Sequence, residues 1–150
     1  MATRAIKRRR PSRGSGGSAG SPVLRGGMAR ALGIRILSLG KRRIVAEMPI
    51  GPRHLNVNGR VNGGAIMAFA DALGAAGALL NRPPGWRGGT IESKTNFFAA
   101  GKGPVLKAVC RALHVGRTTS VWQTTVRNSD GGRVAVVIQT QIALPPGGAD

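Results

Sequence analysis

Aromatic and acidic side chains are both scarce in this chain of 150 residues. Tyrosine is absent and aromatics make up 3% of the residues, so the core must be built from aliphatic and small side chains that allow close backbone packing. Five acidic residues stand against 23 basic ones, which gives a formal net charge of +18. That charge suits RNA, anionic lipid or the phosphates of a nucleotide-bearing substrate, and it does not choose between them.

Cysteine and histidine are too few for two common kinds of site. Cys110 is the only cysteine, so it can form no intramolecular disulfide, and we expect the protein in the cytoplasm. The two histidines and one cysteine do not stand at zinc-ligand spacing, so we expect no metal and no other cofactor. The longest apolar stretch is interrupted by Asp71, and the N-terminus lacks an apolar region, so we expect neither a membrane span nor a signal peptide.

The basic charge is divided unevenly along the chain. Residues 1–27 are rich in Arg, Gly and Ser, hold seven basic residues and no acid, and are expected to form a flexible tail. Its basic run at 7–10 could bind nucleic acid weakly, and an alternative is that translation begins at Met28. Residues 28–150 keep sixteen bases and five acids, a net charge of +11, and are expected to form one domain.

The expected fold class is α+β. Apolar alternation and turn residues predict two short strands, a loop rich in Pro, Gly and Asn, a long apolar helix ended by prolines, and four further strands. The ranges are 33–39 and 42–50 for the first strands, 51–61 for the loop, 62–80 for the helix, and 90–98, 104–115, 118–127 and 133–144 for the later strands. Short links imply antiparallel neighbours, and a helix that is apolar all round must be enclosed by the sheet or by a partner.

Asp71 is the only ionisable side chain between Arg60 and Arg82. A carboxylate among apolar side chains loses hydration, so it normally has a partner or a functional task. The alternative is a structural Asp that is hydrogen-bonded to a neighbouring strand. We interpret Asp71 as a candidate catalytic group.

A second candidate lies where the helix begins. Asn62 is a suitable N-cap, and Gly63 and Gly64 let another group approach the unpaired first-turn N–H donors. A helix N-terminus also favours negative charge, so these residues could form an oxyanion hole. An ordinary cap after a turn, or an Asn-Gly hairpin turn, would explain the same residues.

The two candidates are too far apart to act within one chain. Gly63 and Asp71 are eight residues apart, which is ~12 Å along a helix, and one small reacting group cannot touch both. If they serve the same reaction, a second copy must bring its carboxylate to this N-terminus. The site would then require a dimer.

Two motifs resemble those of the hotdog-fold acyl-CoA thioesterases. The first is N-x-x-G-x-x-N-G-G at 56–64, followed by an acid nine residues after Asn62. The second is the stretch 110–122, which contains Leu-His-Val-Gly-Arg and a later Trp. The pairing is similar to the branch that holds the phenylacetate-pathway, 4-hydroxybenzoyl-CoA and enterobactin proofreading thioesterases. It implies about six antiparallel strands wrapped around one long central helix.

The resemblance implies a role for each matching residue. Asp71 would act as general base or as nucleophile, the Gly63 N–H would hold the carbonyl oxygen, and Asn56 would orient the thioester or water. Asn62 stands where these enzymes usually have His, and an Asn cannot titrate near neutral pH. Ala75 stands where several relatives specific for hydroxylated aromatic acyl groups carry Ser or Thr, which weakens the case for that substrate class.

The resemblance also implies an acyl-CoA substrate and a dimer, with a tetramer plausible. Arg117 would meet coenzyme A phosphates from a turn. His114 could lie near the site, although a satisfied strand residue is the favoured interpretation. Further substrate-binding candidates are Gly64, Met67, Ala75, Gly116 and Thr118, with Ala68 and Phe69 as possible pocket or core residues and Arg87, Lys94, Lys102 and Lys107 as weaker phosphate candidates.

Two other functions fit parts of the sequence. A basic dimer could bind nucleic acid through the tail and the +11 domain, with the helix serving only dimerisation. Alternatively, the protein could bind acyl-CoA without hydrolysing it, because Asn62 replaces the usual His.

Overall fold

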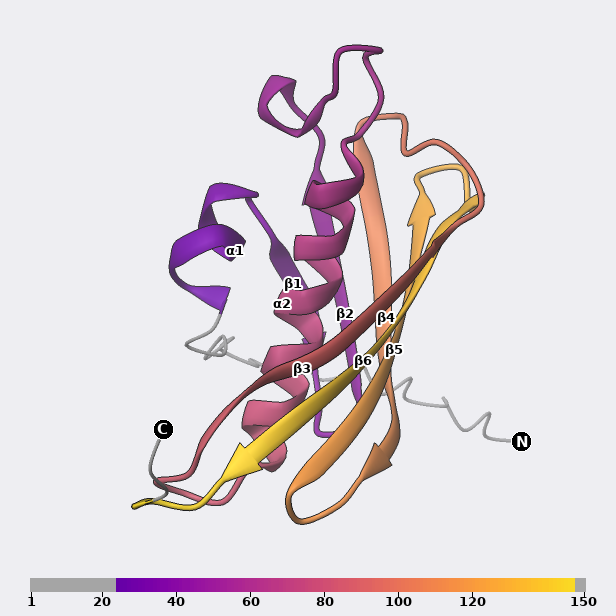
Figure 1. The fold of residues 1–150 in the computed structure, drawn as a ribbon. Helices are drawn as coiled ribbons and strands as arrows, with labels where there is room; N and C mark the ends of the chain where they lie inside the picture. Colours follow the sequence, from indigo (N-terminus) through magenta and orange to yellow (C-terminus); the bar gives the residue numbers. More distant parts are fainter. Residues whose placement is uncertain (1–23, 148–150) are drawn as a thin grey trace, which may run out of the picture.

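The computed structural model describes residues 24–147, which form one antiparallel sheet of six strands and one long helix. Helix α2 lies across the sheet, which curls around it (Figure 1). The strand order is β1-β2-β4-β5-β6-β3. The elements are α1 (Gly27–Ala31), β1 (Arg35–Leu39), β2 (Arg43–Pro49), α2 (Gly63–Asn81), β3 (Arg87–Phe97), β4 (Val105–Val115), β5 (Thr119–Asn128) and β6 (Arg133–Leu144). The predicted α+β fold with a central helix is confirmed.

The strands form because apolar side chains alternate along them. In β2, Ile44, Ala46 and Met48 are fully buried and face the helix, while the residues between them face outward. β4 and β5 alternate in the same way, and Trp122 at the centre of β5 is the largest fully buried side chain. Aliphatic and small residues make up most of the core, as the composition predicts.

Helix α2 begins and ends where its sequence signals predict. The Asn62 side chain caps the first turn by accepting from the Gly64 N–H at 2.7 Å, and the helix ends one residue before Arg82, ahead of Pro83. By length and composition alone α2 could cross a membrane, but 44% of its most apolar window is buried inside this fold, as in a core helix. Its remaining apolar surface is open within one protomer.

The segment at the start of the described residues contains a helix that the prediction lacks. Sequence reasoning did not predict helix α1, because its five residues adjoin a Gly- and Arg-rich tail and show no apolar periodicity of their own. Ala29 of α1 and the flanking Leu24 and Leu32 are buried in the core. The expected basic run at 7–10 lies outside the described residues. The structure therefore places part of the segment preceding Met28 against the domain.

The loop before α2 is held by a buried histidine. His54 Nε2 lies 2.9 Å from the Leu32 carbonyl, and the Gly51 N–H donates to Nδ1 at 2.9 Å. This arrangement fits the neutral tautomer that carries its proton on Nε2. The His54 carbonyl in turn accepts from the Asn62 N–H at 2.7 Å, so the loop fixes the residue that caps α2.

Strand β3 was expected to begin at Thr90, and it begins three residues earlier at Arg87. Gly88 is a poor strand former by composition, but it pairs with Ala143 of β6. A Cβ at Gly88 would lie 2.5 Å from the Ile142 carbonyl oxygen, so this close pairing requires glycine. β3 ends the sheet, and ten of its eleven residues are exposed.

Candidate active site

Asp71 lies on α2 facing the sheet, and it is half-buried rather than enclosed. Its Oδ1 atom accepts two hydrogen bonds, from Thr90 Oγ1 of β3 at 2.8 Å and from Gln139 Nε2 of β6 at 2.7 Å. None of the described residues donates to Oδ2. Oδ1 of Asp71 is therefore hydrogen-bonded to neighbouring strands, as the structural alternative predicted. Oδ2 remains free to contact a substrate or water.

The N-terminus of α2 also leaves its first N–H group, that of Gly63, open. The Asn62 side chain satisfies the Gly64 N–H, and no group of residues 24–147 accepts from the Gly63 N–H. The Phe97 ring from the end of β3 lies close to this donor, since a Cβ at Gly63 would be 3.2 Å from its Cζ atom. Phe97 is half exposed, so the ring can move aside for a ligand.

Within one protomer the two open groups lie on the same continuous helix. α2 runs without interruption from Gly63 to Asn81, so Gly63 and Asp71 are separated by ~12 Å along its axis. The candidate residues accordingly fall into two groups. One lies at the helix N-terminus, and the other lies beside the middle and the C-terminal half of the helix.

Asn56 belongs to the N-terminal group, but its side chain shapes the loop. Its Oδ1 atom accepts from the Asn58 N–H at 3.0 Å and from the Arg60 N–H at 3.1 Å. Only its amide nitrogen is left to meet a ligand, because none of the described groups accepts from it. Any contact of Asn56 with a substrate would therefore be a donated hydrogen bond.

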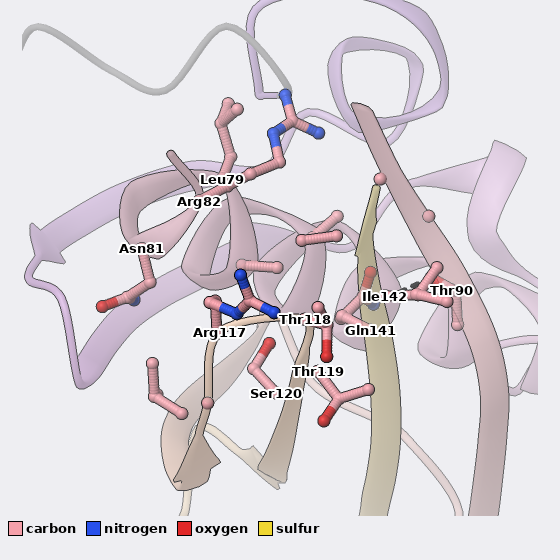
Figure 2. A pocket seen from close by; sticks show the side chains of 17 residues that line it. Leu79, Asn81, Arg82, Thr90, Arg117, Thr118, Thr119, Ser120, Gln141 and Ile142 are labelled. Atoms are coloured by element: carbon pink, nitrogen blue, oxygen red, sulfur yellow. Dashed lines mark hydrogen bonds between the residues drawn. The ribbon is translucent and has the colours of Figure 1, made fainter. Parts of the chain in front are cut away.

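A cavity of about 350 Å³ opens between the C-terminal half of α2, strands β3 and β6, and the β4–β5 turn (Figure 2). Four candidates line it: Ala75, Gly116, Arg117 and Thr118. Its helix side includes the apolar Ala78 and Leu79, with the polar Asn81 and Arg82 at the end of the helix, and Figure 2 shows Arg117 between the turn and the helix. Thr90, which donates to Asp71, is part of the cavity wall; Asp71 itself does not line the cavity, so the wall connects to the carboxylate through this one hydrogen bond.

Other expected residues do not reach the cavity. Phe69 is fully buried in the core, which agrees with core packing, the favoured of its two interpretations. Met67 is 40% exposed on the open face of α2, and Ala68 packs against the core. His114 is exposed, and its ring lies against Gly116, where a Cβ would be 2.8 Å from Nε2.

The weaker phosphate candidates also lie away from the cavity wall. Arg87, Lys94 and Lys107 are not among its lining residues. Lys102 is 4.0 Å from Asp130 and lines a shallower hollow with Arg60 instead. Arg117 is thus the only phosphate candidate from the sequence that lines the larger cavity.

The polar residues of the site that sequence reasoning missed include Thr90, Gln139, Gln141 and Arg82. Gln139 and Gln141 occupy the positions of β6 that face inward, in the same row as the buried Ala135 and Val137. Polar residues in a core-facing row were the available signal, because a buried amide needs a partner. Thr90 and Arg82 carry no such signal, since neither interrupts an apolar pattern.

The described part of the chain, residues 24–147, holds no group of three or more His, Cys, Asp and Glu side chains that could bind a metal ion. The polar groups that point to chemistry are a carboxylate, a free backbone N–H and neutral side chains. This set can accept a proton or attack a carbonyl, and it can stabilise an oxyanion.

The helix-wrapped sheet and these groups define a hotdog-fold protein of the thioesterase class. The family model of the thioesterase superfamily matches residues 58–135, and the chain belongs to that family. It is 35% identical over 109 residues to the proofreading thioesterase EntH of Cronobacter sakazakii, covering 72% of this chain and 79% of that protein. The match confirms the resemblance drawn from the two sequence motifs, and the protein is a thioester hydrolase.

Solved structures agree with this assignment. A mutant thioesterase from Pseudomonas aeruginosa superposes with a TM-score of 0.76 at 27% identity, covering 81% of this chain and 88% of that one. A hypothetical thioesterase from Streptococcus pneumoniae, solved with coenzyme A, gives a TM-score of 0.68 at 25% identity, covering 75% of this chain and 86% of that one.

Proposed function

We propose that the protein is a homodimeric hydrolase of acyl-CoA or acyl-carrier thioesters. In this proposal Asp71 of one protomer and the Gly63 N–H of its partner act on the same thioester carbonyl. The observation that carries the proposal is that both groups are open, Oδ2 of Asp71 and the Gly63 N–H, although ~12 Å of helix separates them in one chain. A two-fold axis between antiparallel helices would bring Asp71 of each protomer close to the Gly63 N–H of its partner.

Two surfaces support a dimer. β3 is a long edge strand with open backbone groups, and Ile91 and Phe97 on it are exposed by 59% and 50%. Such an edge invites pairing with another strand. The open face of α2 around Met67 is apolar and adjoins the site. A second copy that pairs along β3 would cover both surfaces and extend the sheet, and pairs of dimers could form a tetramer.

The chemistry needs few groups. In one route Oδ2 takes a proton from water as the water oxygen bonds to the thioester carbon, and in the other Oδ2 itself forms that bond. The carbonyl oxygen gains negative charge against the Gly63 N–H, where the helix N-terminus also stabilises it. The carbon–sulfur bond then breaks. In the first route the leaving thiolate takes the proton that Oδ2 accepted from water; in the second a water molecule cleaves the acyl–Asp71 anhydride, which restores the carboxylate and supplies the proton of the thiol. Hydrolysis adds one water and yields the acid and the free thiol, so we propose that no metal or redox cofactor takes part.

We further propose an acyl-CoA substrate whose polar end lies near the β4–β5 turn. The S. pneumoniae neighbour solved with coenzyme A supports this choice. Arg117 at the cavity wall is suited to phosphate oxygens, and the apolar helix side of the cavity is suited to hydrocarbon. A cytoplasmic location fits a lone buried cysteine and a nucleotide-bearing substrate.

The test is thiol release from a panel of short, long and aromatic acyl-CoA substrates by wild type and Asp71→Asn. We expect the variant to lose at least ~10²-fold in kcat, because a positioned proton-transfer group contributes that much. Its unfolding midpoint should stay close to that of wild type. Equal rates would contradict the role of Asp71, and salt-sensitive retention on RNA without thiol release would favour the nucleic-acid-binding alternative.

A further inference from the structure

The two oxygens of the Asp71 carboxylate have different surroundings. Oδ1 accepts both available donors, Thr90 at 2.8 Å and Gln139 at 2.7 Å, and Oδ2 accepts none from the described residues. Two donors that converge from two different strands fix both the position and the rotation of a carboxylate. The side chain of Asp71 is thereby held against the sheet with one oxygen turned outward.

The buried position of Gln139 is energetically unfavourable for a polar side chain. The Gln139 side chain is fully buried, and its Oε1 atom has no hydrogen-bond partner among residues 24–147. A buried amide with an unsatisfied carbonyl is less favourable than the hydrocarbon that fills the neighbouring inward positions of β6, such as Val137. A carboxylate can only accept, so the amide nitrogen must face Asp71 and the carbonyl must point away from it.

Gly74 makes room for this arrangement. A Cβ at Gly74, one turn along α2 from Asp71, would lie 2.5 Å from Gln139 Oε1. Any other residue there would push the Gln139 amide out of its place. Helix α2 therefore supplies both the Asp71 carboxylate and, at Gly74, the space that its donor Gln139 occupies.

Thr90 is oriented by a second glutamine. Gln141 Nε2 donates to Thr90 Oγ1 at 2.8 Å, so the hydroxyl of Thr90 accepts from Gln141 and directs its single proton to Asp71. Gln141 is also buried. The result is a chain of two donated hydrogen bonds, from Gln141 of β6 to Thr90 of β3 and from Thr90 to the Asp71 carboxylate.

We propose that Gln139 and Thr90 are positioning residues, which hold Oδ1 of Asp71 so that only Oδ2 is presented to the thioester or to water. This inference rests on the proposed role of Asp71. Neither residue touches the reacting atoms in this scheme. Their loss should therefore lower kcat through misplacement of Oδ2 and leave substrate affinity nearly unchanged.

The test compares Gln139→Met and Thr90→Val, which remove the donors at similar volume, with Thr90→Ser, which restores the hydroxyl. The matched control is Thr95→Val, because Thr95 lies on the same strand and its buried hydroxyl has no hydrogen-bond partner in the described part of the chain. We expect kcat to fall about tenfold to a hundredfold in the first two variants, with KM within about twofold of wild type. Thr90→Ser and Thr95→Val should keep kcat close to that of wild type.

A double variant separates positioning from general damage to the fold. In an Asp71→Asn background, Gln139→Met and Thr90→Val should lower kcat no further, because the group that they position is already lost. If Gln139→Met does not fold, Thr90→Val at its exposed position decides the matter. Wild-type kcat in Thr90→Val, together with an inactive Asp71→Asn, would overturn the inference alone. Full activity of Asp71→Asn would overturn the proposed function and the inference together.

Discussion

Gly77 of α2 lies against the ring of Trp122 in the sheet. A Cβ at this position would lie 2.6, 2.7 and 2.8 Å from three carbons of the Trp122 ring. Carbon atoms prefer a separation of about 3.5–4 Å, so the ring or the helix would have to move by roughly 1 Å. Trp122 is fully buried, and its Nε1 donates to Ser120 Oγ at 2.9 Å, so the ring has little room to yield.

We therefore predict that Gly77→Ala lowers the free energy of unfolding. Overpacking of a filled core costs about 1–3 kcal/mol, and the better helix propensity of Ala returns up to about 1 kcal/mol. Because the Trp122 ring is buried and hydrogen-bonded, we expect an overpacking cost of about 3 kcal/mol. After the gain in helix propensity, the net loss in the free energy of unfolding is about 2 kcal/mol. Urea unfolding at one fixed protein concentration would measure it, since a dimer makes apparent stability depend on concentration.

The Trp122→Phe background provides the control for Gly77→Ala. Phenylalanine lacks the outer ring carbons that approach Gly77, so the same substitution should there be neutral or stabilising, whatever Trp122→Phe costs by itself. The expected coupling between the two sites is about 2 kcal/mol. A Gly77→Ala protein as stable as wild type, or an equal loss in both backgrounds, would refute the packing argument.

Two other predictions concern a buried thiol and the cavity wall. Burial raises the pKa of the Cys110 thiol from 9.0 to about 11, so the folded state retains a proton that the unfolded state loses. Relative to Cys110→Ala, the wild type should keep its free energy of unfolding below pH 9 and lose up to about 3 kcal/mol of it as the pH rises to 11. A constant difference in the free energy of unfolding between the two proteins across this range would contradict the raised pKa. Arg117→Ala should raise KM for acyl-CoA about three- to tenfold at unchanged kcat, and high salt should reduce the effect. Arg111→Ala, outside the cavity, should leave KM unchanged, and equal effects of the two variants would argue against phosphate binding at Arg117.

Most of the fold follows from local signals in the sequence. Alternation in β2 places Ile44 and Met48 in the core, Asn62 begins α2, and Pro83 follows its end. Each of these depends on a residue and its immediate neighbours, which is why sequence reasoning finds them. Gly88 shows the opposite case, because its strand conformation depends on pairing with β6 rather than on its own propensity.

The site was only partly predictable for a related reason. Asp71 and Gly63 stand out because each interrupts a local pattern, one as a charge in an apolar run and one as a glycine at a helix start. The partners of Asp71 are 19 and 68 residues away along the chain, and no local pattern specifies which strand residue will meet a helix residue. The separation of Gly63 and Asp71 needed only the rise of a helix, and it leads to the central claim that two protomers share each site.

Two variants that disable different halves of the site test this claim. Asp71→Asn removes the carboxylate, and Gly63→Pro removes the N–H. Proline is tolerated at the first helical position, and Asn62 before it already has extended backbone angles of −61° and 135°. Each variant alone should lose about 10²-fold or more in kcat.

The decisive measurement is the thiol-release rate of a hybrid dimer with one Asp71→Asn subunit and one Gly63→Pro subunit, purified through two different affinity tags. One of its two sites would combine an intact carboxylate with an intact N–H, so the account predicts about half of the wild-type rate per dimer. A hybrid no more active than its two parents would contradict a site shared between protomers.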